Sequence, residues 1–462
     1  MGHNSGVRAT VALVAVAALF VAACGADDDA SSSTEGTSSS TTPPTSVAAT
    51  GRWIDGEPAW AAVESRGGVD VESTGVATEM ASAAVDEEFG DDAIVRPEPS
   101  LAATSQLRAG SVDDNADYQG FLEYLYRIRD LGIALRDLDA TDRSVVTVAT
   151  AVGASVGGVE VTITAGDSST IVRTTADGTA RFLPGLYPAF TDVAGPYTAS
   201  IGDATTEFAR GAVVALVVEA PGSAATPVPL DVAFLLDATG SMRDEIDRLK
   251  QTIDTIAERV AVLDPAPDVR FAMTLYRDEG DAFVTSTYDF TGDVGEFRAA
   301  LSRVVADGGG DYPEALDEGL AEVLAAPAWR SADDAVQLVF LVADAPPHVD
   351  RQVSAGYPDS VRTAIERGVK LFPIASSESD DQAEAVFRQI AQATGAPFVF
   401  LSYGAGGSAT GGSTDIDRTD YEELALDELV VRLISEELAA LSGGDVTLPS
   451  TTAPPGTNPE GQ

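Results

Sequence analysis

Five consecutive residues, Asp237-Ala238-Thr239-Gly240-Ser241, follow an apolar run at 230–236 and carry the chemistry that is easiest to interpret. One carboxylate and two hydroxyls alternate along this segment, so all three can converge on one point. Oxygen-only donors suit a hard divalent cation. The segment predicts a cation site, with Mg²⁺ as the first choice and Mn²⁺ or Ca²⁺ as alternatives. A simpler alternative is that Thr239 or Ser241 only caps the following helix.

Two more loops offer acidic residues in a similar setting. A glycine run, 308–310, precedes Asp311, and the apolar run 336–342 is followed by Ala343 and Asp344. In a parallel sheet with helices on both faces, the carboxyl ends of the strands face the binding crevice. We therefore expect Asp237, Asp311 and Asp344 to meet there as metal ligands with Thr239 and Ser241.

The elements that must position these loops lie within residues 226–441. Apolar strand-like runs alternate there with helical patterns, which predicts an α/β fold with a doubly wound, mostly parallel sheet of the Rossmann-like type. The expected strands are 230–236, 269–276, 283–290, 336–342, 370–375 and 397–402. The expected helices are 242–262, 295–305, 313–325, 360–368, 381–393 and 421–441, the third with Pro313 in its first turn.

Residues 144–221 differ, because short strand-like runs follow one another without helices. They predict a small all-β sandwich that precedes the α/β domain and acts as a spacer. Asp177-Gly178 is a hairpin signal between two of its strands. The segment is similar to carboxypeptidase-regulatory or Cna-B-type modules. It contains neither lysine nor asparagine, which excludes the Lys–Asn crosslink found in some of those modules.

The amino terminus is typical of a targeting segment. Arg8 precedes an unbroken run of small and apolar residues at 11–23, which is too short for a membrane span. Val21-Ala22-Ala23-Cys24 resembles a bacterial lipobox, which implies a signal peptide at 1–23 and a lipid on Cys24. We expect an extracytoplasmic protein that touches the membrane only through this lipid. The alternative is an ordinary secreted protein with an incidental cysteine.

The remaining segments carry weaker signals. Residues 24–50 are rich in serine and threonine and predict a flexible tether. Residues 51–110 predict mostly loop, with short helical pieces near 78–85, and 111–143 predict a helical segment capped by Asn115 or Asp117. The tail, 442–462, predicts disorder.

The charge balance limits the partners. With 28 basic and 73 acidic residues, the formal net charge is −45. Such a surface repels nucleic acid, so we expect no nucleic-acid partner. The alternative is that the acidic residues only keep an exported protein soluble. Cys24 is the one cysteine, which excludes an intrachain disulfide.

The ordered motifs of 226–441 resemble the metal-ion-dependent adhesion site (MIDAS) of von Willebrand factor A (vWA) domains. Asp-x-Thr-x-Ser at 237–241, the glycine loop with Asp311, and Asp344 match in order, as do the companion segments 276–278, 290–291 and 312–315. The subgroup is similar to that of alpha-kinase-associated and hemicentin-like proteins. The resemblance implies a Mg²⁺ held directly by Thr239 and Ser241, with Asp237 and Asp344 acting through water.

One departure and three neighbouring residues bear on this resemblance. Integrin-type vWA domains have a neutral threonine where this chain has Asp311, and three carboxylates would leave the site near −1, which weakens its pull on a partner's carboxylate. Asp278 is a candidate for indirect contact with the metal, or else a solvated turn residue. Tyr312 is a candidate for the crevice rim, or else an ordinary exposed tyrosine. His348 is a candidate ligand or base, or else a loop histidine.

The sequence favours an adhesion protein that recognises a protein or envelope partner through its metal site. The alternative is a structural or regulatory lipoprotein whose metal only stabilises the crevice. An enzyme is not expected, because the mature chain would have one histidine, His348, and a cysteine blocked by lipid.

Overall fold

The computed structural model describes residues 51–56, 107–219, 226–310, 312–333, 335–376, 379–402, 421, 423–443 and 446–448. The expected signal peptide at 1–23, Cys24 and the expected tether lie outside these residues. So do the expected helical pieces near 78–85 and, within the glycine loop, Asp311. The predictions made for them stay predictions.

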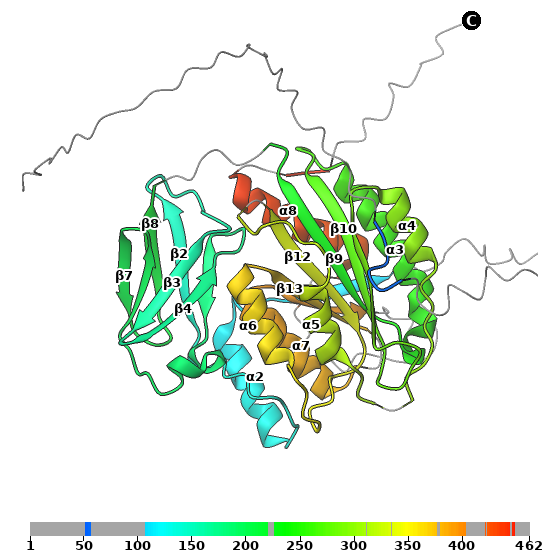
Figure 1. Ribbon diagram of the computed structural model, residues 1–462, viewed down its shortest axis with the longest axis horizontal. Helices are drawn as coiled ribbons and strands as arrows, with labels where there is room; N and C mark the ends of the chain where they lie inside the picture. Colours follow the sequence, from blue (N-terminus) through cyan, green and yellow to red (C-terminus); the bar gives the residue numbers. More distant parts are fainter. Residues whose placement is uncertain are drawn as a thin grey trace, which may run out of the picture. The chain divides into compact units, whose positions relative to one another are not determined.

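The larger domain is built on an eight-stranded sheet with the order β11-β10-β9-β12-β13-β14-β1-β15 (Figure 1). Its central strands β9 and β12 are buried along nearly their whole length and are mostly apolar, as is typical of parallel strands covered on both faces. The strands are β1 (Arg108–Val112), β9 (Pro229–Asp237), β10 (Asp268–Tyr276), β11 (Thr285–Thr291), β12 (Val336–Ala343), β13 (Lys370–Ala375), β14 (Phe398–Ser402) and β15 (Leu424–Ala425).

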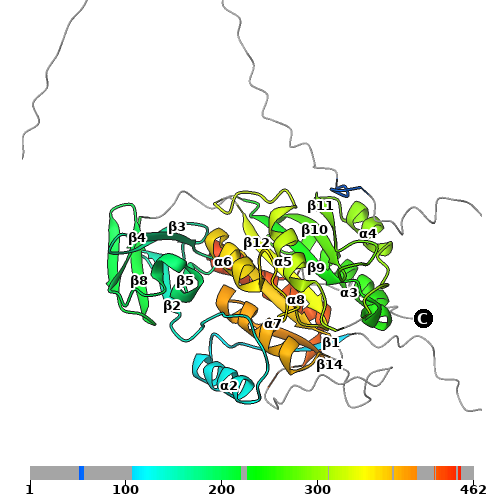
Figure 2. The ribbon, with the colours of Figure 1, turned by 60° about the horizontal axis from the view of Figure 1, so that its bottom comes forward.

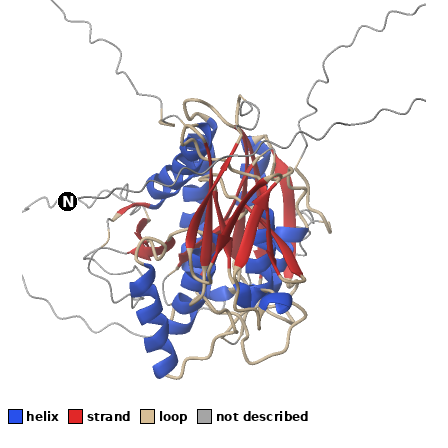
Figure 3. Cartoon of the chain, turned by 90° about the vertical axis from the view of Figure 1, so that its left-hand side faces the viewer, coloured by secondary structure: helices blue, strands red, loops and turns tan. Residues whose placement is uncertain are grey.

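Helices cover both faces of this sheet (Figure 3). One layer holds α3 (Arg243–Ala261), α4 (Val294–Ser302) and α8 (Leu426–Ser442), and the other holds α5 (Leu316–Ala325), α6 (Tyr357–Arg367) and α7 (Asp381–Thr394). The doubly wound, mostly parallel α/β fold is therefore confirmed. Helix α5 begins three residues later than expected, and Pro313 lies in the turn before it. No described helix is both long and apolar enough to cross a bilayer.

Segments that precede the sandwich in sequence join the sheet of the larger domain. Strand β1 pairs antiparallel with β14 and β15. At the opposite edge, residues 51–56 lie along β11, where the Ile54 amide donates to the Thr287 carbonyl at 2.9 Å and Trp53 packs edge-on against Tyr288. Within the segment expected to be mostly loop up to residue 110, regular structure begins at Arg108 in β1, while 51–56 is a loop with a single bridge residue, Trp53. These pairings join residues hundreds of positions apart, which local sequence patterns do not show.

Helix α2 (Tyr118–Asp130) confirms the helix expected within 111–143. Asp117 caps it by accepting a hydrogen bond from the Gly120 amide at 3.1 Å. The helix packs on α7, where the buried Arg388 pairs with Asp114 and lies over the ring of Tyr124. Residues 107–143 thus form part of the larger domain.

The sandwich consists of a three-stranded sheet, β5-β2-β8, and a four-stranded sheet, β4-β3-β6-β7 (Figure 2). Aromatic side chains, among them Phe182, Phe190 and Tyr197, fill the space between the sheets. Its strands are β2 (Ser144–Thr150), β3 (Glu160–Ala165), β4 (Ser168–Arg173), β5 (Thr179–Phe182), β6 (Tyr197–Ile201), β7 (Ala204–Phe208) and β8 (Val213–Val218).

Two expectations for the sandwich are wrong. Asp177-Gly178 does not close a hairpin, because it joins β4 of one sheet to β5 of the other. The sandwich also does not separate the α/β domain from the amino-terminal residues, because the chain enters the large sheet at β1, leaves it for the sandwich and returns at β9. It is an insertion and not a linear spacer.

Short 3-10 turns and the start of the tail complete the described chain. The turns are Pro184–Leu186, Pro188–Phe190 and Gly240–Met242. Past α8, Thr447 forms a bridge with Asp264, with N–O distances of 2.8 and 3.1 Å. The prediction of disorder from residue 442 is therefore wrong for 446–448.

Candidate metal centre

Three neighbouring strands end together at the carboxyl edge of the sheet. Asp237, the last residue of β9, is aligned with Tyr276, the last of β10. On the other side of β9, Leu236 is aligned with Val342, so Asp344 follows just beyond the end of β12. The topology thus brings Asp237 and Asp344 to one crevice, as the βα order requires.

The first loop folds its oxygens onto one another. The Oδ1 atom of Asp237 accepts hydrogen bonds from the amide of Thr239 at 2.9 Å and from its Oγ1 at 2.6 Å. The Thr239 and Ser241 hydroxyl oxygens lie 3.1 Å apart. Met242 is the N-cap of α3, and neither it nor Thr239 makes a side-chain capping bond. The helix-cap alternative is therefore wrong, and both hydroxyls keep lone pairs for a cation.

The two described carboxylates of this loop cluster are deeply buried. Asp237 is fully buried and Asp344 is 4% exposed. Burial, followed by the nearby Asp344, raises the pKa of Asp237 to about 7. The buried Tyr276 hydroxyl donates to Asp237 Oδ2 at 3.1 Å. Such a pair of like charges needs a cation to be fully ionised.

The glycine loop contacts the first loop and the loop that follows β10. Gly308 and Gly309 have φ values of +81° and +68°, which favour glycine. The Gly240 amide donates to the Gly308 carbonyl at 3.0 Å, and Asp281 Oδ2 accepts from the Gly309 amide at 2.8 Å. A Cβ atom on Gly308 would lie 2.5 Å from the Asp281 carboxylate. Asp281, which sequence reasoning missed, therefore holds this loop in place.

Glu314 is a second acidic residue that sequence reasoning did not assign to the site. Its side chain is 4% exposed, and its Oε2 atom has no hydrogen-bond partner among the described residues. A Cβ atom built on Gly309 would lie 2.8 Å from Glu314 Oε1 and 3.2 Å from the Cβ of Thr239, so the carboxylate faces the first loop. Burial, followed by Asp237 and Asp278, raises the pKa of Glu314 to about 9. The position of Glu314 within the 312–315 motif is the sequence feature that could have assigned it to the site.

The structure also places the three neighbouring candidates. Asp278 Oδ1 and His348 Nε2 lie 2.8 Å apart and both side chains are buried, so Asp278 is not a solvated turn residue. His348 lies in a loop, as the second alternative expected, and its ring is held by Asp278. Tyr312 is 47% exposed beside Asp380. Burial of its hydroxyl, followed by Asp380, raises the pKa of Tyr312 above its usual value.

These residues fit a hard divalent cation. Among the described residues, this crevice brings carboxylates together with hydroxyls. Asp237, Thr239, Ser241 and Asp344 supply such a set, and Ser241 is exposed. We call these four residues the candidate metal centre.

Comparison with known proteins identifies the family of the larger domain. Residues 231–403 match the family model described as von Willebrand factor type A domain. A von Willebrand factor type A domain is therefore present in this chain.

Two curated proteins are similar to this region, and the chain spans less than a quarter of either. The alpha-protein kinase vwkA of Dictyostelium discoideum is 30% identical over 143 residues, 31% of this chain and 22% of that protein. An ariadne-like RING finger protein of Acanthamoeba polyphaga mimivirus is 26% identical over 139 residues, 29% and 13% of the two chains. Among solved structures, BatB from Bacteroides thetaiotaomicron is 12% identical with a TM-score of 0.32, covering 45% of this chain and 98% of that one.

Proposed function

We propose that this protein is a cell-surface binding protein whose von Willebrand factor type A domain takes up a divalent cation and uses it to recognise a protein or envelope partner. The convergence of the Thr239 and Ser241 hydroxyls with Asp237, beside Asp344, carries the proposal. These residues would hold Mg²⁺, or else Mn²⁺ or Ca²⁺, and such an ion would act as a Lewis acid toward a carboxylate of the partner. Thr239 and Ser241 hold the ion directly, and Asp237 and Asp344 hold its waters.

A second function is favoured by one observation. Glu314 adds another buried carboxylate next to the candidate metal centre. When it is ionised, this carboxylate makes the centre more negative, which weakens the pull of the ion on an external carboxylate. In this alternative the ion only stabilises the crevice of a structural or regulatory lipoprotein.

Asp344→Asn separates the two functions. We expect calorimetry to show that the variant has lost most of its Mg²⁺ affinity, because one anion that orders the ion's waters is gone. Its Mg²⁺-dependent capture of a partner from the parent cell envelope, measured against chelator, should disappear while the circular dichroism spectrum is unchanged. The matched control is Asp350→Asn, in the following loop, whose carboxylate is 77% exposed.

The outcomes are distinct. Lost capture with the thermal stability retained supports recognition through the metal. Lost thermal stability with capture retained supports the stabilising role. A wild-type chain that takes up none of the three cations contradicts both.

The proposed location rests on Cys24 as the site of lipid attachment, with the signal peptide at 1–23. We expect Cys24→Ser to move the protein from the membrane fraction to the soluble extracytoplasmic fraction, because a thiol is needed for the anchor. Cell fractionation with immunoblotting measures this. Retention of the variant in the membrane fraction would overturn the anchor.

A further inference from the structure

Strand β8 lies at one edge of the three-stranded sheet of the sandwich and pairs on one side only, with β2 (Figure 1). The Val145 amide of β2 donates to the Ala212 carbonyl at 2.9 Å, which fixes the phase of this parallel ladder. Because every second residue of a strand bonds to a given neighbour, the amides and carbonyls of Val213, Ala215 and Val217 point to the other side. That side is an open sheet edge, because no described strand pairs with it.

The same three residues form an apolar strip on the outer face of the sheet. Val213 is 72% exposed and Val217 is 61% exposed, and Ala215 between them is exposed as well. Leu216 points to the other face, is 3% exposed and belongs to the core. The six side chains of β8, Val-Val-Ala-Leu-Val-Val, include no charged residue and no proline. An open, apolar edge strand of this kind is a site at which another strand can pair.

The other sheet edges within the described ranges are protected, as edges in native proteins usually are. Residues 51–56 cover β11, and β15 is only two residues long. In the sandwich, β4 packs against α6, and the guanidinium of Arg181 on β5 lies against Gly395 of the larger domain. Strand β7 exposes the charged Glu207. Among these edges, β8 is therefore the one that neither a charge nor another segment protects.

The charge of the chain indicates which strand fits this edge. A formal net charge of −45 makes copies of the chain repel one another over most of their surface. Residues 211–218 carry no charge, so two copies can approach there with the least repulsion. A basic partner would instead favour the acidic parts of the surface. The fitting occupant is an uncharged apolar strand, and β8 of a second copy is such a strand.

We propose that two copies of this chain pair antiparallel through β8, about a twofold axis at Ala215. Val213 then lies opposite Val217 of the second copy, and Ala215 lies opposite Ala215. This register opposes all three free residues of both strands and forms about six backbone hydrogen bonds, two for each opposed pair. Glu219, the one charged residue at the end of the strand, falls opposite the uncharged Gly211. No like charges are therefore opposed along the paired strands.

The same surface patch serves both copies, so the pairing closes as a dimer. It joins the two three-stranded sheets into one continuous sheet. A dimer carries two candidate metal centres, which would strengthen binding to a partner with repeated sites. The pairing itself uses no metal, so it stands or falls independently of the proposed metal-dependent function.

Ala215→Cys tests the register, in a full chain that also carries Cys24→Ser so that the new thiol is the only one. Opposed residues of a hydrogen-bonded antiparallel pair have Cα atoms about 5.5 Å apart, which is within disulfide range. We expect mild oxidation to convert most of this variant into a covalent dimer on a non-reducing gel.

Val217→Cys in the same background is the matched control. Position 217 lies opposite Val213 of the second copy and is roughly 13 Å along the strand from its own copy, so little covalent dimer should form. Equal crosslinking of the two variants would reveal random collisions and would overturn the proposal. So would a failure of Ala215→Cys to crosslink.

Sedimentation equilibrium of the full Cys24→Ser chain measures the association without a crosslink. At about 100 µM, we expect a mass close to twice that of one chain, in Mg²⁺ and in chelator alike. Ala215→Lys opposes two like charges at the twofold axis and should leave a monomer, with an unchanged circular dichroism spectrum because the side chain is exposed.

Ser169→Lys makes the same charge change at an exposed position of β4, on the far edge of the other sheet, and should still form the dimer. A parent chain that stays monomeric at about 100 µM contradicts the proposal. The same holds for a dimer that persists in Ala215→Lys, or for one that Ser169→Lys disrupts to the same extent.

Discussion

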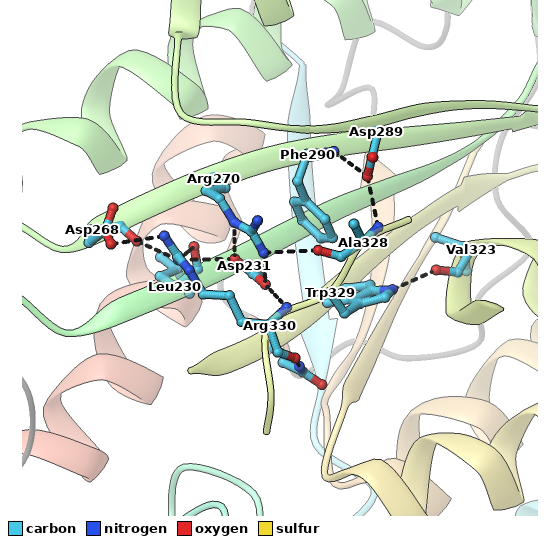
Figure 4. A network of polar contacts seen from close by, with 11 residues as sticks. Leu230, Asp231, Asp268, Arg270, Asp289, Phe290, Val323, Ala328, Trp329 and Arg330 are labelled. Atoms are coloured by element: carbon cyan, nitrogen blue, oxygen red, sulfur yellow. Dashed lines mark hydrogen bonds and ion pairs between the residues drawn. The ribbon is translucent and has the colours of Figure 1, made fainter. Parts of the chain in front are cut away.

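We expect Asp231→Asn to lower the free energy of unfolding by about 3 kcal/mol or more. Asp231 is fully buried at the amino end of β9 and accepts hydrogen bonds from Arg270 at 2.7 and 2.9 Å (Figure 4). It also accepts from the amide and the guanidinium of Arg330, at 2.8 and 3.0 Å. Removing one partner of a buried ion pair leaves the other charge unpaired, which typically costs about 3–5 kcal/mol.

Denaturant unfolding followed by circular dichroism measures this effect. The matched control is Asp268→Asn, because Asp268 also pairs with Arg330, at 2.8 Å, but its carboxylate is 55% exposed. Exposed pairs contribute only about 0.2–1 kcal/mol, so the control should stay close to the wild type. If the two variants lose similar amounts of stability, the buried network does not hold the amino ends of β9 and β10 together.

Without a divalent cation, we expect the stability of this protein to fall as the pH rises from about 5 to 8. Burial raises the pKa of Asp237 to about 7 and that of Glu314 to about 9 in the folded chain. At pH values between the unfolded and the folded pKa, the folded state binds more protons than the unfolded state. The free energy of unfolding therefore falls as the pH rises, by about 1.4 kcal/mol per pH unit for each such proton. The stabilisation by the protonated carboxyl groups is fully present at low pH, and it is lost as the pH rises through their pKa values in the folded state.

Saturating Mg²⁺ should reverse the trend, because the ion needs the ionised carboxylates and competes with protons. An ion at 100 times its Kd stabilises the folded state by about 2.7 kcal/mol. Thermal unfolding at pH 5.5 and 8.0, with chelator and with Mg²⁺, tests both statements. Asp237→Asn should flatten the pH dependence in chelator, and Asp307→Asn, whose side chain is 71% exposed, should not. Stability that rises with pH in chelator would contradict the arrangement of these acids.

The sequence alone was sufficient for the βα order and for the main loop of the candidate metal centre. Strands such as β9 and β12 consist mostly of apolar residues, and nearly continuous apolar runs mark parallel strands buried on both faces. Because the carboxyl ends of these strands meet at one edge, Asp237 and Asp344 could be placed in one crevice before any coordinates were known. Thr239 and Ser241 followed from their spacing along the chain.

The tertiary structure alone decided what depends on contacts between distant residues. Strand β1 joins the sheet through partners about 290 residues away, which makes the sandwich an insertion. Pro313 and Glu314 lie in the turn before α5. In this turn the Glu314 carboxylate faces the Gly309 loop, next to the metal centre. Lys370 forms an ion pair with Asp177 of the sandwich and another with Glu437 of the larger domain. Local sequence patterns show which face of an element is apolar, but they do not show which distant segment covers that face. The pairings above depend on which distant segments pack together.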